Sequence, residues 1–332
     1  MALHPVAEAT EDSVFGSLSP LEFYDLHRVA HSSGYFTLAA GTDGMAGKMF
    51  TQSWSPLPPT PIIGTVAVLH GFGSHSSSPI LLTCVLFAKS GFATCAVDYP
   101  GHGLSDGLRG HIPNIRPVVR DCAAVFDSFR ARHPPSLPAF LYGESLGAAV
   151  ALLVALRDSP ARGWDGIVLS GGMCGLRPGV SPPWPLERLL EVAATVIPTW
   201  PVGFTRTDLT KASFKVEWKR RLAMASRSSR LPWPRAATAL ELLRLCRELQ
   251  GRFAEVEAPM LIVHGGDDAV CDPACSEELY RVARSQDKAI RIYPGMWHLL
   301  VGEDDEGVEL VFGEILQWLR SRALRAASPG GA

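Results

Sequence analysis

The stretch Phe140-Leu141-Tyr142-Gly143-Glu144-Ser145-Leu146-Gly147-Ala148-Ala149 decides the fold of this chain. An apolar run ends in Gly-x-Ser-x-Gly and passes directly into small residues, which are typical of a helix packed closely on a strand. This order predicts a strand–turn–helix in which Ser145 has a strained backbone conformation and an exposed hydroxyl. Gly143 and Gly147 are required because side chains there would collide where the chain folds back.

On both sides of this stretch, apolar strands alternate with helices. Strands are predicted over residues 65–70, 92–98, 138–142, 166–170, 259–264 and 289–293, and helices over residues 79–90, 115–132, 146–157 and 307–325. Near-continuous Val, Ile and Leu runs between helices predict an α/β fold, with a mostly parallel sheet covered by helices on both faces. Earlier in the chain, residues 34–40 and 48–54 flank Gly41-Thr-Asp-Gly44 and predict a β-hairpin, and residues 21–30 have helix character.

The alternation is interrupted between Met173 and Pro234, where eight prolines and four tryptophans occur. The stretch offers no sheet strand, yet it is too apolar for an exposed linker, so it predicts a cap inserted over the C-terminal edge of the sheet. The predicted division is an N-terminal segment packed on the core (1–30), two parts of the core (31–172 and 235–326), the cap (173–234) and a disordered tail (327–332).

The amino-acid composition limits the classes of protein to which this chain can belong. The 332 residues are 47% hydrophobic and 19% charged, and they suit one large globular domain with an insertion or two modest domains. A net charge of −2 without a long basic tract argues against a nucleic-acid partner. The sequence predicts neither a signal peptide nor a membrane span.

Seven scattered cysteines, an odd number, predict reduced thiols in a cytoplasmic protein. Cys271 and Cys275 lack the second ligand pair that a structural zinc site needs. We therefore expect no metal and no organic cofactor.

A serine hydroxyl becomes a good nucleophile when a histidine removes its proton and a carboxylate fixes the tautomer of that histidine. For a serine on this kind of turn, the order along the chain is Ser, then Asp or Glu, then His. Two histidines follow Ser145. His298 lies in a loop just beyond the last predicted strand and is the expected base, whereas His264 ends a strand and is expected to pack there.

Three aspartates compete for the role of the acid in Val263-His-Gly-Gly-Asp-Asp-Ala-Val-Cys-Asp272. Asp268 is the favoured candidate and Asp267 the next. Asp272 precedes Pro273, which is the pattern of a helix N-cap.

Two backbone N–H groups fixed in advance are needed to stabilise a developing oxyanion. Leu146, directly after the serine, is expected to supply one of them, and Phe72 in the glycine-rich loop after the strand at 65–70 the other. His70 is expected to brace that loop rather than to react. Together with Gly71 and Gly73 it is also a candidate for contact with substrate.

Five motifs together resemble the monoacylglycerol lipase family of serine hydrolases, closest to its plant branch with caffeoylshikimate esterase-like and lysophospholipase-like members. They are His70-Gly-Phe-Gly73, Asp98-Tyr-Pro-Gly-His-Gly-Leu-Ser-Asp-Gly107, Gly143-Glu-Ser-Leu-Gly147, Gly265-Gly-Asp-Asp-Ala-Val-Cys-Asp272 and Gly295-Met-Trp-His298. They keep the family order within residues 21–319. The resemblance implies an α/β-hydrolase fold with a lid, a Ser145–Asp268–His298 triad, and hydrolysis of monoacylglycerol or a related carboxylic ester. It also implies that Cys271 lies beside the substrate pocket.

The chain departs from the family at positions that bear on the substrate. Animal lipases of the family have a glutamate and an arginine after the glycine-rich loop, where this chain has Ser74-His-Ser-Ser-Ser78, and Leu146 stands where methionine is usual. Family membership therefore leaves the ester open, with monoacylglycerol, hydroxycinnamoyl esters such as caffeoylshikimate, and lysophospholipid as alternatives. An acyltransferase that uses the same triad and a non-catalytic ligand receptor are the rival classes.

The cap carries two features that bear on partners. Its four tryptophans suit an acyl chain or an aromatic acid, or they pack the cap on the sheet; they are Trp184, Trp200, Trp218 and Trp233. Its basic side chains suggest weak docking on anionic membrane surfaces, with a solvated helix face as the alternative. These are Lys211, Lys215, Lys219, Arg220, Arg221, Arg227, Arg230 and Arg235. The expected partner is a small ester or lipid, and the oligomeric state stays open.

Overall fold

An eight-stranded sheet forms the centre of the molecule, in the order β1-β2-β4-β3-β5-β6-β7-β8. The computed structural model describes residues 3–38, 47–157, 163–203, 208–225 and 233–327. The strands are Val29–Thr37 (β1), Lys48–Pro56 (β2), Gly64–Leu69 (β3), Phe92–Val97 (β4), Ala139–Glu144 (β5), Gly166–Ser170 (β6), Met260–Gly265 (β7) and Lys288–Tyr293 (β8). β2 pairs antiparallel with β1 and β4, and every other pairing is parallel. The predicted mostly parallel sheet is confirmed.

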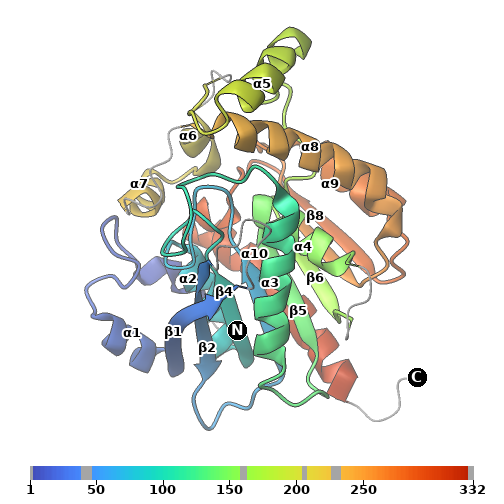
Figure 1. The fold of residues 1–332 in the computed structure, drawn as a ribbon. Helices are drawn as coiled ribbons and strands as arrows, with labels where there is room; N and C mark the ends of the chain where they lie inside the picture. Colours follow the sequence, from blue (N-terminus) through green and yellow to red (C-terminus); the bar gives the residue numbers. More distant parts are fainter. Residues whose placement is uncertain (1–2, 39–46, 158–162, 204–207, 226–232, 328–332) are drawn as a thin grey trace.

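Helices cover both faces of this sheet (Figure 1). The α-helices are Pro20–Leu26 (α1), Ile80–Lys89 (α2), Ile115–Arg130 (α3), Leu146–Ala155 (α4), Trp184–Val196 (α5), Leu209–Ser213 (α6), Glu217–Ala225 (α7), Ala236–Arg252 (α8), Pro273–Val282 (α9) and Asp305–Ala327 (α10). Short 3-10 turns form at Pro5–Glu8 (η1), Phe253–Glu255 (η3) and Leu300–Gly302 (η4). Helices α3, α4 and α9 pack on one face, and α1, α2 and α10 pack on the other.

The alternation of side chains along the strands explains the continuous apolar runs in the sequence. In β5, Leu141 packs toward α3 and α4, while Phe140 and Tyr142 on either side of it pack toward α2 and α10. Because both faces of the strand are buried, each position favours an apolar residue. The described helices include none that is both long and apolar enough to cross a membrane.

The N-terminal part differs in length from the sequence-based prediction. Helix α1 begins at a capping box between Ser19 and Glu22 and ends at Leu26. The prediction that the helix continues to residue 30 is wrong, because Arg28 has a φ of 56° and the backbone is already extended at Val29. The predicted hairpin is confirmed in β1 and β2, although its turn at residues 41–44 lies outside the described residues.

Helices α5, α6 and α7 form from residues 173–234, and the described residues of that stretch contribute no strand to the sheet. Figure 1 shows the three helices together at the top of the view, above the sheet, with α8 beneath α5. The first half of α8 packs on Leu190 of α5, and its second half enters the core through Leu245 and Leu249. Helix α8 thus joins both parts, so the predicted boundary at residue 234 stays a proposal. The predicted tail begins at residue 327, which the structure places at the end of α10, and residues 328–332 lie outside the described part.

Candidate active site

Ser145 lies at the turn between β5 and α4, so the predicted strand–turn–helix is confirmed. Its φ of 55° is in a region that side-chain-bearing residues rarely adopt, and the surrounding contacts must enforce it. A Cβ on Gly143 would lie 2.3 Å from the Gly147 carbonyl oxygen, and a Cβ on Gly147 would lie 2.1 Å from the Leu69 carbonyl oxygen. Two glycines are therefore required for this turn to form. The Ser145 N–H also donates to the Ser170 carbonyl at 3.0 Å, which ties the turn to β6.

His298 comes from the loop between β8 and α10, and its ring connects the serine to a carboxylate. His298 Nε2 lies 2.9 Å from Ser145 Oγ, and Nδ1 lies 2.7 Å from Asp268 Oδ2. Because the carboxylate can only accept, Nδ1 carries the proton, and Nε2 is left with a lone pair for the serine hydroxyl. The structure thus brings Ser145, His298 and Asp268, far apart in the chain, into one hydrogen-bonded line.

The Asp268 carboxylate is buried and accepts four hydrogen bonds. Oδ1 accepts from the backbone N–H groups of Val270 (2.8 Å) and Cys271 (2.9 Å), and Oδ2 accepts from His298 and from His264 Nε2 (2.9 Å). Burial alone would raise the pKa of Asp268, but the charge and hydrogen bonds of the two histidines outweigh it and hold this pKa well below its usual range. The acid is therefore ionised and fixed in orientation.

The two competing aspartates lie elsewhere. Asp267 is exposed, and its backbone N–H donates to the Met296 carbonyl at 3.0 Å. Asp272 caps the N-terminus of α9 by accepting from the Ala274 N–H at 3.1 Å, which confirms the predicted N-cap. It also lies 3.8 Å from the Arg177 guanidinium.

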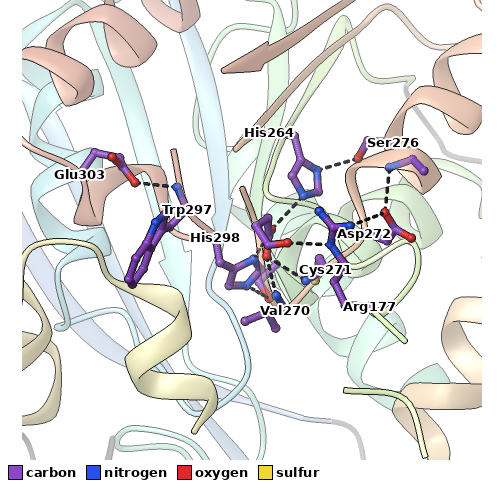
Figure 2. A network of polar contacts seen from close by, with 12 residues as sticks. Arg177, His264, Val270, Cys271, Asp272, Ser276, Trp297, His298 and Glu303 are labelled. Carbon is purple, nitrogen blue, oxygen red and sulfur yellow. Dashed lines mark hydrogen bonds and ion pairs between the residues drawn. The ribbon is translucent and has the colours of Figure 1, made fainter. Parts of the chain in front are cut away.

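His264 does more than the packing role predicted for it. Its Nε2–H donates to Asp268 Oδ2, and its Nδ1 accepts from the Ser276 hydroxyl at 2.8 Å. Figure 2 shows His264 and His298 within one network of polar contacts. The signal in the sequence was the position of His264 at the end of a strand, four residues before the favoured acid.

The glycine-rich loop after β3 lies directly against the serine. A Cβ on Gly71 would be 3.3 Å from Ser145 Cβ, and Gly73 has a φ of 75°. Within the described residues, the backbone N–H groups of Phe72 and Leu146 have no hydrogen-bond acceptor. These two groups remain available, and their predicted role as oxyanion donors stays a prediction.

His70 is buried behind this loop, and both of its ring nitrogens are engaged. Nδ1 donates to the Gly71 carbonyl at 2.8 Å, and Nε2 accepts from the Tyr99 N–H at 3.3 Å. Burial lowers the pKa of His70 to about 3, so the ring is neutral. This arrangement fits the predicted bracing role better than contact with substrate.

Cys271 lies beside the acid, on the loop between β7 and α9. Burial, followed by the charge of Asp268, raises the pKa of its thiol well above the usual value, so the sulfur is not a thiolate nucleophile. Ligand atoms of Asp268, Cys271 and His298 lie within 4.8 Å of one another, which is a spacing that metal sites share. The lone pairs of Asp268 are already taken by four donors, however, so the group fits a shared proton better than a metal ion.

Glu144, the residue before the serine, is a further buried acid that the sequence did not single out. Its Oε1 accepts from the Tyr142 hydroxyl at 2.7 Å. Burial raises the pKa of Glu144 to about 7, although this hydrogen bond and the charge of His298 oppose the shift. Its signal in the sequence was a carboxylate at an otherwise apolar strand end.

Comparison with known proteins gives one family and several relatives. Residues 60–305 match the family described as serine aminopeptidase, S33. The chain is 31% identical to the caffeoylshikimate esterase of Arabidopsis thaliana over 98% of its own length and 96% of that protein. It is 27% identical to the monoacylglycerol lipase of Mycolicibacterium smegmatis, over 85% of its length and 95% of that protein.

Among solved structures, the chain resembles a soluble variant of monoglyceride lipase from Saccharomyces cerevisiae in complex with a substrate analogue. The TM-score is 0.74 at 22% identity, over 88% of this chain and 95% of the other. This likeness shows an α/β-hydrolase fold.

Proposed function

Because the chain belongs to the serine aminopeptidase S33 family of α/β hydrolases, we propose that it is a serine esterase that cleaves lipophilic carboxylic esters, with monoacylglycerol as the preferred class. The observation that carries this proposal is the hydrogen-bonded line from Ser145 Oγ through the His298 ring to Asp268, at 2.9 and 2.7 Å. This geometry suits acyl transfer to an activated serine.

In the proposed first step, His298 Nε2 takes the proton of Ser145 as Oγ attacks the ester carbonyl carbon. The N–H groups of Leu146 and Phe72 stabilise the oxyanion, and removal of one such donor typically costs about 3 kcal/mol. The imidazolium then gives its proton to the departing alcohol oxygen as the ester C–O bond breaks. In the second step, His298 takes a proton from water as the water oxygen attacks the acyl carbon. The imidazolium then returns this proton to Ser145 Oγ as the acyl–Oγ bond breaks, which releases the acid and restores the serine hydroxyl.

A hydroxycinnamoyl ester such as caffeoylshikimate is the second candidate substrate. It is favoured by the identity to the Arabidopsis thaliana esterase, which is higher and covers more of the chain than that to the Mycolicibacterium smegmatis lipase. The preference for a lipid ester is supported by the large apolar side chains that α5 exposes, because an enzyme for a small soluble ester has no need of them.

A substrate panel tests the proposal. It contains a monoacylglycerol, a lysophospholipid and caffeoylshikimate at equal concentration, with the Ser145→Ala variant as background. We expect the highest kcat/KM on monoacylglycerol. Selective cleavage of caffeoylshikimate would assign the second candidate. A folded enzyme that cleaves none of them, and that a fluorophosphonate probe does not label at Ser145, would be a ligand receptor. Adding a glycerol or shikimate acceptor and analysing the products distinguishes hydrolysis from acyl transfer to an alcohol.

We further propose that residues 173–234 form a cap that meets lipid surfaces, and that the protein works in a reducing compartment such as the cytoplasm, in keeping with seven free cysteines. Attraction through basic side chains loses support, because every basic residue of the described cap has a hydrogen-bond or ion-pair partner. The contacts are Arg177–Asp272, Arg188–Glu191, Lys211–Asp208, Lys215–Glu303, Lys219–Asp305, Arg220–Glu217 and Arg221–Glu11. Arg235, just beyond residue 234, donates to the Arg109 and Thr199 carbonyls. Arg227 and Arg230 lie outside the described residues.

Apolar contact through α5 is the better-supported route to a lipid surface. Trp184 and Trp200 are 74% and 65% exposed, so for these two the alternative of packing on the sheet is wrong. Leu189, Val192 and Val196 between them are exposed as well. An apolar helix face that begins at one tryptophan and has a second, Trp200, four residues beyond its last residue suits the membrane–water interface.

Replacing Trp184 and Trp200 together with alanine is expected to lower binding to phosphatidylcholine vesicles more than tenfold, since burial of each large side chain contributes about 2 kcal/mol. Co-sedimentation with vesicles measures this partition. The matched control is Leu21→Ala with Leu26→Ala, which removes exposed apolar side chains from α1. Binding that requires phosphatidylserine and ignores the tryptophans would contradict the apolar route.

A further inference from the structure

The loop that carries His298 is held through one peptide group just before the histidine. The Met296 carbonyl accepts from the Asp267 N–H at 3.0 Å, and the Trp297 N–H donates to Glu303 Oε1 at 2.6 Å. The two hydrogen bonds hold the C=O and the N–H of the same peptide group, the one between Met296 and Trp297. The first comes from the loop that carries the acid, and the second comes from a side chain that the triad does not use.

Glu303 is a buried residue whose carboxylate pairs with Lys215. It directly follows η4, two residues before α10 begins, and only 1% of its surface is exposed. Oε2 lies 3.3 Å from Lys215 Nζ, an ammonium group on the segment between α6 and α7. A buried charge is tolerated when it is paired and hydrogen-bonded, and here the Trp297 N–H and the Lys215 ammonium meet both needs.

The same lysine and its neighbours join the cap to the histidine loop at four further points. Lys215 Nζ donates to the Gly295 carbonyl at 2.9 Å, and Lys219 Nζ donates to the Glu303 carbonyl at 2.7 Å. Two backbone bonds flank them, Leu299 N–H to Ser213 O and Val216 N–H to Gly302 O, each at 3.0 Å. Figure 2 shows Glu303 contacting the backbone of Trp297, next to His298.

We propose that Glu303 is a positioning residue for His298, and that its contacts with Lys215 and the Trp297 N–H couple the cap segment 213–219 to the catalytic imidazole. The inference rests on the proposed function, because it assigns Glu303 a task only if His298 is the base. Glu303 itself touches neither Ser145 nor Asp268.

Glu303 can affect the rate through His298 because the reaction is sensitive to small displacements of a catalytic group. A displacement of about 1 Å in a catalytic group can cost roughly 100-fold in rate. The Met296–Trp297 peptide group has one bond on each side, so removal of the Glu303 side chain leaves the Trp297 N–H without its acceptor and this peptide group held only through the Met296 carbonyl. The effect should fall on kcat, because the contacts that bind substrate are left in place.

The test compares Glu303→Ala with Glu303→Gln in the full chain, with p-nitrophenyl butyrate as the substrate and the rate of fluorophosphonate labelling as a second readout. For Glu303→Ala we expect kcat to fall roughly 10- to 100-fold with KM within about threefold, and labelling to slow by the same factor. Glu303→Gln keeps an oxygen acceptor for the Trp297 N–H but loses the charge that pairs with Lys215, so its kcat should lie severalfold below the wild type and clearly above that of Glu303→Ala. An alanine variant that folds and keeps the wild-type kcat overturns the proposal, and so does a glutamine variant as slow as the alanine variant.

Lys215→Met decides the matter if Glu303→Ala does not fold, because the Lys215 side chain is 41% exposed and the Trp297 N–H still donates to Glu303 after its removal. We expect kcat to fall severalfold at unchanged KM. Arg220→Met on α7 removes an ion pair with Glu217, whose side chain is 67% exposed, and should have the wild-type kcat. Within the described residues, the Arg220 side chain makes no hydrogen bond or ion pair with Glu303 or the histidine loop. An unchanged kcat in Lys215→Met, or an equal loss in Arg220→Met, overturns the coupling. Wild-type protein that neither turns over nor labels would instead refute the proposed function itself.

Discussion

Replacing Ser145 with alanine is expected to lower kcat for the preferred ester by about six orders of magnitude, because the acyl-enzyme route is lost and only binding and the oxyanion donors remain. The fold should survive this change. Alanine has no larger side chain to place, and the φ of 55° is as unfavourable for alanine as for serine. The variant should therefore melt close to the wild-type temperature while showing no turnover above background.

Contaminating esterase activity sets the limit of that measurement, so loss of fluorophosphonate labelling is the stronger readout. A double variant with His298→Ala provides the control. Because the two residues act as a unit, it should be no slower than Ser145→Ala alone. A Ser145→Ala protein that retains even about one hundredth of the wild-type rate would mean that the nucleophile is another residue.

The turn around Ser145 could be predicted from sequence because each determinant is local. Gly143, Gly147 and the small residues after them act within a few positions of the serine, and the neighbouring carbonyl oxygens leave no room for a Cβ at either glycine. The same holds for Asp272, whose cap is satisfied two residues further on. Such features can be predicted from the sequence because the residues that form them lie close together in the chain.

Features that depend on distant segments could not be predicted in this way. His298 and Asp268 were proposed from their order along the chain, but their contact depends on the meeting of the ends of β7 and β8. The roles of His264 and Glu303 were missed for a related reason. His264 takes its role from a carboxylate that turns back over the strand end, and Glu303 takes its role from Lys215 on the cap, 88 positions earlier (303 − 215). Neither partner leaves a periodic signal in the sequence.

Replacing Asp268 with asparagine is expected to lower kcat by about 10⁴-fold with little change in KM. The reason is the orientation that the side-chain amide of the new asparagine must adopt. Two backbone N–H groups, from Val270 and Cys271, point at the Oδ1 position, so the amide oxygen takes that position and the NH2 group takes the position of Oδ2. This NH2 then donates to His298 Nδ1, which must give up its proton. The imidazole proton moves to Nε2, where it blocks acceptance of the Ser145 proton.

Two matched variants separate this tautomer effect from a loss of charge. Asp267→Asn changes the neighbouring, exposed carboxylate by the same atoms and should keep the wild-type kcat. His264→Gln replaces the ring N–H donor to Oδ2 with a more flexible amide and leaves the proton on His298 Nδ1, so it should cost no more than about tenfold, in line with a change in an outer hydrogen-bond partner. The three variants should thus rank Asp267→Asn, His264→Gln and Asp268→Asn in order of increasing loss of kcat. If Asp268→Asn instead matched His264→Gln, the carboxylate would serve only to hold the loop, and the histidine would find its tautomer without it.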